Sequence, residues 1–184
     1  MVLLRALFLA AVIGTASVTA FAPPALADVH QLRFETIDGD ELPLGDYRGT
    51  PLLVVNTASL CGFTNQYADM QDVWRRYRDR GLMVIGVPTD DFHQELDSNA
   101  EIKEFCEVNF AIDFPLTSKV TSRGPHQHPF FGQVATELGE EALPRWNFHK
   151  FLVDGDGQLI ESWPSSVRPT DAQVTDAIDR LLAN

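Results

Sequence analysis

Two stretches of the chain, residues 51–58 and 82–88, are apolar almost without interruption. Runs of this kind, without polar alternation, are typical of parallel strands that are buried on both faces of a sheet. Between them, residues 64–79 carry apolar side chains at helical spacing, with arginines on the opposite side and towards the carboxyl end. The pattern predicts one β-α-β unit with a right-handed crossover.

The pattern continues with a hairpin and a helix. An alternating run, a turn and further apolar positions predict a short hairpin over residues 30–44. Ser98, with Glu101 three residues later, is typical of a capping box at a helix start. The helix that follows has an apolar face made of Ile102, Phe105, Cys106 and Phe110.

The last third of the chain predicts a helix, a hairpin and a closing helix. Pro129 is placed to open a helix that runs to about Leu138. Strands are expected at residues 148–153 and 159–163, joined by a turn with two Asp-Gly pairs. Thr170 and Gln173 form a second predicted capping box. A β-α-β half followed by a β-β-α half is the order of the thioredoxin-like fold, an α/β fold with a central mixed sheet flanked by helices, here in a single domain.

Residues 1–27 are set apart from this pattern. Arg5 is their only charge, a largely apolar run follows it, and Ala25-Leu26-Ala27 has the small-x-small form of a cleavage site. A membrane anchor is the alternative, but polar and small residues interrupt the run, which is short for a span of about 20 residues. We therefore predict a secretory signal peptide at 1–27, a single domain at 28–184, no stable membrane insertion, and a secreted, periplasmic protein.

The chain is acidic, with a formal net charge of −12 at pH 7. Loss of the leader would make the charge one unit more negative, which disfavours nucleic acid and anionic membranes as partners. Both cysteines, Cys61 and Cys106, lie in the predicted domain. In an oxidising compartment an even pair is compatible with one structural disulfide, and the spacing is equally compatible with a catalytic pair.

Cys61 comes directly after the first buried strand and before the predicted helix. Unpaired amide groups and the positive end of a helix dipole lower the pKa of a thiol, so this position favours a reactive thiolate. The alternative is a small buried hydrophobic side chain, the commonest role of a free cysteine.

Strand direction brings two other segments to the same edge of the sheet. The loop at 89–97 follows the carboxyl end of the second parallel strand, and Trp146-Asn147 precedes a strand that this fold makes antiparallel. Gln94, Trp146 and Asn147 are the hydrogen-bonding side chains that these segments offer to Cys61.

Three segments closely resemble motifs of the glutathione peroxidase family. Residues 56–67 resemble its peroxidatic motif in the cysteine form, residues 86–95 the motif that supplies a glutamine, and residues 146–153 the motif that supplies a tryptophan and an asparagine. The resemblance extends from about residue 34 to 169. It implies that Cys61 is the catalytic thiol and that Gln94, Trp146 and Asn147 assist it, with no cofactor.

The chain departs from the family pattern at two places. The second motif is one residue shorter between Phe92 and Gln94, and Asp90-Asp91 stands where the family has an Asn-Gln-like pair. An acidic pair close to a thiol works against its ionisation. The stretch between Leu138 and Trp146 lacks the long insertion of the tetrameric animal members, which implies a monomer.

Cys106 has two interpretations. Its position on an apolar helix face is typical of core packing. Residues 105–115 also resemble the segment that holds the resolving cysteine in members that use thioredoxin. The resemblance therefore implies a thiol peroxidase that reduces hydrogen peroxide and organic hydroperoxides and is recycled by glutathione or a thioredoxin-like protein.

Other functions fit the residues less well. A thioredoxin-fold redox sensor or binding protein would share the thiol chemistry but would not sustain turnover. A general disulfide oxidoreductase normally has a Cys-x-x-Cys pair, and Thr64 stands at the second position. His126 and His128 suggest a metal site, but they lack the further cysteine ligands that zinc would want, so we predict no metal.

Overall fold

The computed structural model describes residues 28–183. Its centre is a four-stranded sheet in the order β4 (Met83–Pro88), β3 (Leu52–Thr57), β5 (Lys150–Val153) and β6 (Leu159–Trp163). β3 and β4 are parallel, and β5 is antiparallel to both of its neighbours. A separate antiparallel hairpin is formed by β1 (Arg33–Glu35) and β2 (Glu41–Pro43). The sequence therefore predicted the mixed sheet and the hairpin correctly. The predicted leader at residues 1–27 lies outside the described residues.

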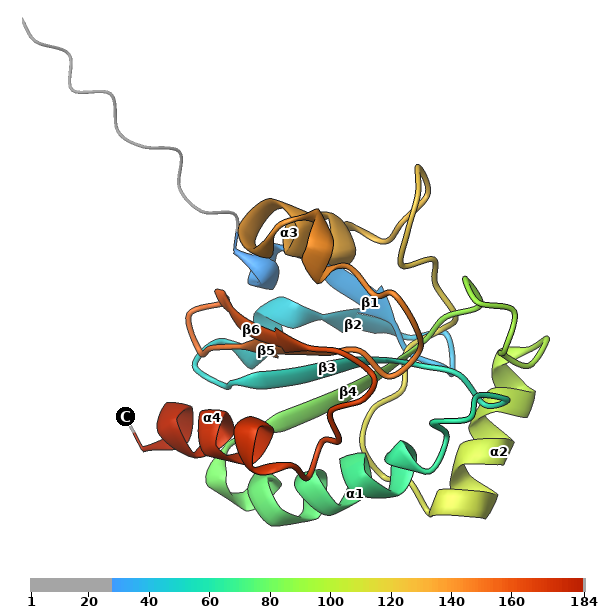
Figure 1. Cartoon of the computed structure of the whole chain (residues 1–184), viewed down its shortest axis with the longest axis horizontal. Helices are drawn as coiled ribbons and strands as arrows, with labels where there is room; N and C mark the ends of the chain where they lie inside the picture. The colour runs from blue at the N-terminus through green and yellow to red at the C-terminus, as the bar shows by residue number, and fades with distance from the viewer. Residues whose placement is uncertain (1–27, 184) are drawn as a thin grey trace, which may run out of the picture.

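Helices cover both faces of the sheet. Figure 1 shows α1 (Gln66–Tyr77) and α4 (Ala172–Leu182) on one side and α3 (Pro129–Leu138) with the small hairpin on the other. α2 (Asn99–Phe110) stands at the end of the molecule, next to the start of α1. Within residues 28–183, no helix is long and apolar enough to cross a bilayer.

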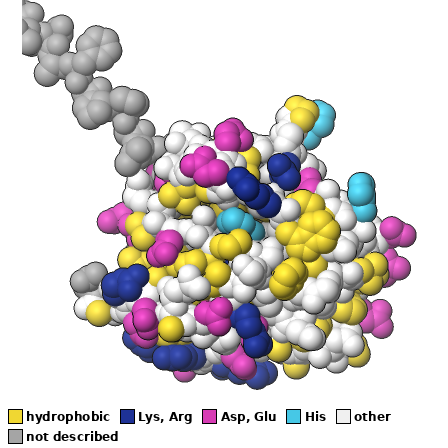
Figure 2. Space-filling view, in the orientation of Figure 1, with side chains coloured by type: hydrophobic (Ala, Val, Ile, Leu, Met, Phe, Trp, Pro, Cys, Tyr) yellow, Lys and Arg dark blue, Asp and Glu magenta, His cyan; other side chains and the backbone are white. Residues whose placement is uncertain are grey.

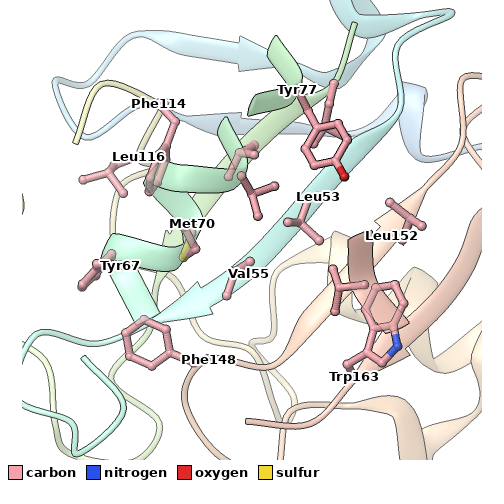
Figure 3. Packing of buried hydrophobic residues seen from close by; sticks show 14 of the residues in the cluster. Leu53, Val55, Tyr67, Met70, Tyr77, Phe114, Leu116, Phe148, Leu152 and Trp163 are labelled. Atoms are coloured by element: carbon pink, nitrogen blue, oxygen red, sulfur yellow. The ribbon is translucent and has the colours of Figure 1, made fainter. Parts of the chain in front are cut away.

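The sheet divides the interior into two apolar layers. Every residue of β3 is buried, so that Leu53 and Val55 face the layer under α1 and α4, while Leu52 and Val54 face the layer under α3. Figure 3 shows the first layer, where Tyr67 and Met70 of α1 pack on β3 and on Phe148. Because both faces of β3 are buried, its sequence does not alternate between apolar and polar residues. The buried strand ends at Thr57, and the turn that carries Cys61 follows it.

Most predicted boundaries hold, but β5 begins at Lys150, two residues later than predicted, and two predicted helix starts are wrong. Ser98 and Glu101 form the predicted capping box of α2, and Pro129 opens α3. α1, however, begins at Gln66, two residues later than expected, because turns occupy the preceding residues. The second capping box is absent: Asp171 is the residue before α4, and its carboxylate accepts a hydrogen bond from the Arg168 amide instead.

Candidate active site

Cys61 lies in a tight turn between β3 and α1. The Thr64 amide donates to the Cys61 carbonyl (3.0 Å), and the Thr64 hydroxyl also points at carbonyl oxygens of this turn. The Phe63 amide points at the Cys61 sulfur, with 3.4 Å between N and Sγ. The nearest amide donor is thus supplied by the turn, and not by the first residues of α1 as the sequence suggested.

Gln94 and Asn147 meet beside this turn. The Asn147 side-chain amide donates to Gln94 Oε1 (3.0 Å), and the Gln94 carbonyl accepts from the Leu60 amide (2.8 Å). Asn147 is completely buried, and its Oδ1 has no hydrogen-bond partner among residues 28–183. The shortened loop therefore does bring Gln94 to the residue that precedes Cys61, and an acceptor remains free at the site.

The backbone next to both amide side chains is strained. His93 and Phe148 adopt the left-handed conformation, with φ of 54° and 62°. For residues with a Cβ this conformation costs about 1–2 kcal/mol each, so the surrounding structure must impose it. Each strained residue directly adjoins one member of the Gln94–Asn147 pair, which indicates that the fold places this pair at the expense of local backbone energy.

Trp146 forms part of an exposed apolar rim around the turn. Its side chain is 39% exposed and packs against the Phe92 ring, with 5.1 Å between centroids. Phe63 and Trp146 together line an open pocket of about 520 Å³, and Leu60 is 61% exposed beside Cys61 in the chain. The three segments that the sequence assigned to one sheet edge are therefore in contact there.

Asn56 holds these segments together, a role that the sequence reasoning did not assign. Its side-chain amide donates to the Thr89 hydroxyl and to the Trp146 carbonyl (3.3 Å each), and its Oδ1 accepts from the His149 amide (2.9 Å). A polar residue within a wholly buried strand must find such partners, and that was the available signal in the sequence.

The acidic pair, Asp90 and Asp91, accepts hydrogen bonds from residues within and next to the loop at residues 89–97. Asp91 Oδ2 accepts hydrogen bonds from the amide (2.7 Å) and hydroxyl of Ser122, and Asp90 Oδ1 accepts from the Glu95 amide. Both carboxylates therefore have hydrogen-bonding partners within or next to the loop.

Cys106 lies in the second half of α2 and is completely buried. Burial raises the pKa of its thiol to about 12, although the neighbouring Tyr67 hydroxyl opposes this rise. Both cysteines are free thiols. The interpretation of Cys106 as a core residue therefore holds for this reduced state. The structure does not contain the alternative, a structural disulfide between the two cysteines.

Within residues 28–183, no group of three or more His, Cys, Asp or Glu side chains is arranged to hold a metal ion. His128 instead precedes α3, where its Nδ1 accepts from the Phe130 amide and its ring stacks on Phe34. A helix cap and a ring contact account for this histidine.

The comparison with known protein families decides what this site belongs to. Residues 29–135 match the family model described as glutathione peroxidase. The chain belongs to the glutathione peroxidase family. It is a thiol-dependent peroxidase, an oxidoreductase that acts on peroxides.

Individual relatives agree with this assignment. The chain is 39% identical over 155 residues to a hydroperoxy fatty acid reductase of Synechocystis sp., covering 79% of this chain and 90% of the relative. It is 40% identical over 136 residues to a glutathione peroxidase-like peroxiredoxin of Schizosaccharomyces pombe, covering 72% and 85%.

Solved structures confirm the thioredoxin-like fold. The crystal structure of Trgpx in its apo form superposes with a TM-score of 0.69 at 28% identity, covering 86% of this chain and 97% of that one. A thiol:disulfide interchange protein of Chlorobium tepidum superposes with a TM-score of 0.61 at 18% identity, covering 89% and 99%. The second likeness concerns the fold alone.

Proposed function

We propose that Cys61 is the residue that reduces the peroxide. Its thiolate attacks one peroxide oxygen, the O–O bond breaks, and the other oxygen leaves with a proton as water or an alcohol, so that Cys61 becomes a sulfenic acid. The observation that carries this proposal is the turn itself, in which the Phe63 amide points at the sulfur and the Gln94 carbonyl holds the preceding residue.

Gln94, Asn147 and Trp146 are proposed to assist this step. Preorganised donors stabilise charge that develops on the departing oxygen. The side-chain amides of Gln94 and Asn147 are already fixed relative to each other, and the indole N–H of Trp146 is available at the same edge. We assign these residues to the departing oxygen and to the thiolate.

The substrates that we propose are hydrogen peroxide and organic hydroperoxides. The exposed side chains of Leu60, Phe63 and Trp146 provide an apolar approach to the turn. Such a surface suits a hydroperoxide with a hydrocarbon part, and the relative from Synechocystis is named for a fatty acid hydroperoxide.

Cys106 is proposed as the resolving cysteine. Its thiol would attack the sulfenic sulfur of Cys61, forming the S–S bond, breaking the S–O bond and releasing water. A completely buried thiol on α2 must first leave its helix environment. Ile102 and Cys106 are the buried residues of α2, and Phe105 and Phe110 pack against the core while partly exposed, so local opening of this helix disrupts a limited set of core contacts.

We further propose that the protein is an exported, periplasmic monomer. The composition of residues 1–27 supports export, and the short segment between α3 and β5 supports the monomer. The thiol that returns the enzyme to its reduced form would be glutathione or a thioredoxin-like protein.

Steady-state turnover separates this function from a redox sensor. Purified mature protein is supplied with peroxide and either glutathione or a thioredoxin system, and peroxide consumption is followed over many turnovers. We expect sustained consumption with at least one reductant. A single stoichiometric oxidation with both would instead indicate a sensor.

A further inference from the structure

Glu95 is a buried carboxylate that the proposed mechanism does not use. Its side chain is near the end of the loop that carries Gln94, and the residue is only 7% exposed. Oε1 accepts a hydrogen bond from the Ser59 amide (2.9 Å), two residues before Cys61, and another from the Leu96 amide (2.8 Å). Together with the bond from the Leu60 amide to the Gln94 carbonyl (2.8 Å), this gives two consecutive links to the Cys61 turn.

The second oxygen of Glu95 is oriented differently. Oε2 is buried and has no hydrogen-bond partner among residues 28–183. A carboxylate in such a place is costly, and its burial raises the pKa of Glu95, although the Ser59 hydroxyl, the Leu96 and Ser59 amides and the Lys119 ammonium oppose this rise. Its charge also reaches Tyr67 and Cys106. A structure that only needed to fill this space would do so better with an apolar side chain.

The chain runs directly from Glu95 into α2. Ser98, three residues later, is the N-cap of α2, and its capping box is complete. Lys119 donates to the carbonyls of Leu96 and Asp97 (3.0 and 3.2 Å), which fixes the short connection. Only three residues therefore separate Glu95 from the first residue of α2.

We propose that Glu95 is a positioning residue: it holds the Cys61 turn in its peroxide-reactive arrangement while α2 is folded and releases the turn when α2 opens. The release half rests on the proposed resolving role of Cys106. The hydrogen bond to Ser59 is the physical link between the two cysteines. While this bond is intact, Cys61 is held in place for its reaction with peroxide. When the bond breaks, Cys61 is free to meet Cys106 and form the disulfide.

Two substitutions of Glu95 and a matched control test the holding half. Glu95→Gln keeps an oxygen that can accept from the Ser59 amide, whereas Glu95→Ala removes it. Glu107→Ala removes another carboxylate near Cys106, an exposed one on α2 without a link to the turn. The rate constant for sulfenic acid formation at Cys61 should fall about 10- to 100-fold in Glu95→Ala, the scale of a small misplacement of a reacting group. It should stay within a few fold of the wild type in the other two.

Amide hydrogen exchange at Ser59 gives the readout that a general loss of stability would not reproduce. We expect protection of this amide to be lost in Glu95→Ala while that of β3 and β4 is kept. In the wild type, protection should also be lost on conversion to the Cys61–Cys106 disulfide. In Cys106→Ser it should persist after peroxide treatment, because α2 stays folded.

Separate results would overturn each half. A wild-type oxidation rate in folded Glu95→Ala, or an equal loss in Glu95→Ala and Glu95→Gln, overturns the holding role. A disulfide that forms while Ser59 stays protected overturns the release, and this comparison needs only the wild type if Glu95→Ala does not fold. Absence of any disulfide would remove the resolving role of Cys106 and the release with it, while the oxidation rates still decide whether Glu95 holds the turn.

Discussion

The two cysteines are both buried, but their immediate surroundings within the domain differ. Cys61 sits in a turn at the edge of the sheet, where the Phe63 amide points at its sulfur and side-chain amides from two other segments converge. Cys106 sits on the inner face of α2, completely buried among apolar side chains, and burial raises the pKa of its thiol to about 12. The two thiols thus differ mainly in their neighbours: a backbone amide of the turn points at the Cys61 sulfur, whereas Cys106 lies on a helix and is completely buried.

The largest effect should follow from removing Cys61, the cysteine proposed to react with peroxide. Cys61→Ser should abolish peroxide consumption and leave the fold intact, because a hydroxyl is a weak nucleophile without a partnered base. Peroxide consumption is measured with each reductant, and circular dichroism serves as the folding control. Activity that survives this substitution would refute Cys61 as the reacting residue.

Alkylation should show the contrast between the two thiols directly. At a pH below 9, a thiol of pKa about 12 has roughly 1000-fold less thiolate than one at the reference value of 9.0. Cys106 should therefore be modified more slowly in the folded protein than in urea, by up to about 1000-fold. Its rate should rise about tenfold per pH unit up to about pH 12, unless opening of α2 supplies the exposed thiol. Mass spectrometry of alkylated peptides measures both sites, and equal rates in the folded state would contradict the difference.

Loss of a side chain next to Cys61 should slow the reaction with peroxide measurably, although less than loss of Cys61 itself. Gln94→Ala or Asn147→Ala should slow sulfenic acid formation roughly 10- to 1000-fold, the range for loss of a preorganised donor. Stopped-flow oxidation of the reduced protein measures this step. A normal rate in Gln94→Ala would show that its contact with Asn147 has no part in the chemistry.

The stability of α2 should tune only the second cysteine. Ala111, at the end of α2, has a left-handed conformation with φ of 50°, so Ala111→Gly should stabilise this helix end by about 1 kcal/mol. Disulfide formation should then slow about fivefold while the oxidation of Cys61 is unchanged. Glu104 is at an exposed position within α2. Glu104→Gly should destabilise the helix by about 1 kcal/mol relative to Glu104→Ala, and disulfide formation should be faster by a similar factor. Effects of equal sign in the two tests would show that opening of α2 does not limit the step.

The sequence predicts the contrast only in part. Apolar runs revealed β3 and β4, strand direction placed Gln94 and Asn147 at one edge, and Ser98 with Glu101 marked the start of α2. The turn at residues 58–65 was not predictable, because its bonds depend on the Thr64 hydroxyl and on Glu95 from another segment. The N-cap of α4 was assigned to the wrong residue because Thr170 and Asp171 are both of a type that often caps helices. In the structure, Asp171 is the N-cap.

The central claim is that Cys61 reacts with peroxide and Cys106 resolves the product, and peroxide treatment of the reduced protein tests it most directly. One equivalent of peroxide is added to the wild type and to Cys106→Ser, and intact-mass and peptide mass spectrometry follow at once. The account predicts an intramolecular Cys61–Cys106 disulfide in the wild type and a sulfenic acid at Cys61 in Cys106→Ser, which then overoxidises with more peroxide. An oxidised Cys61 beside an unmodified Cys106 thiol in the wild type, with undiminished turnover of Cys106→Ser, would contradict it.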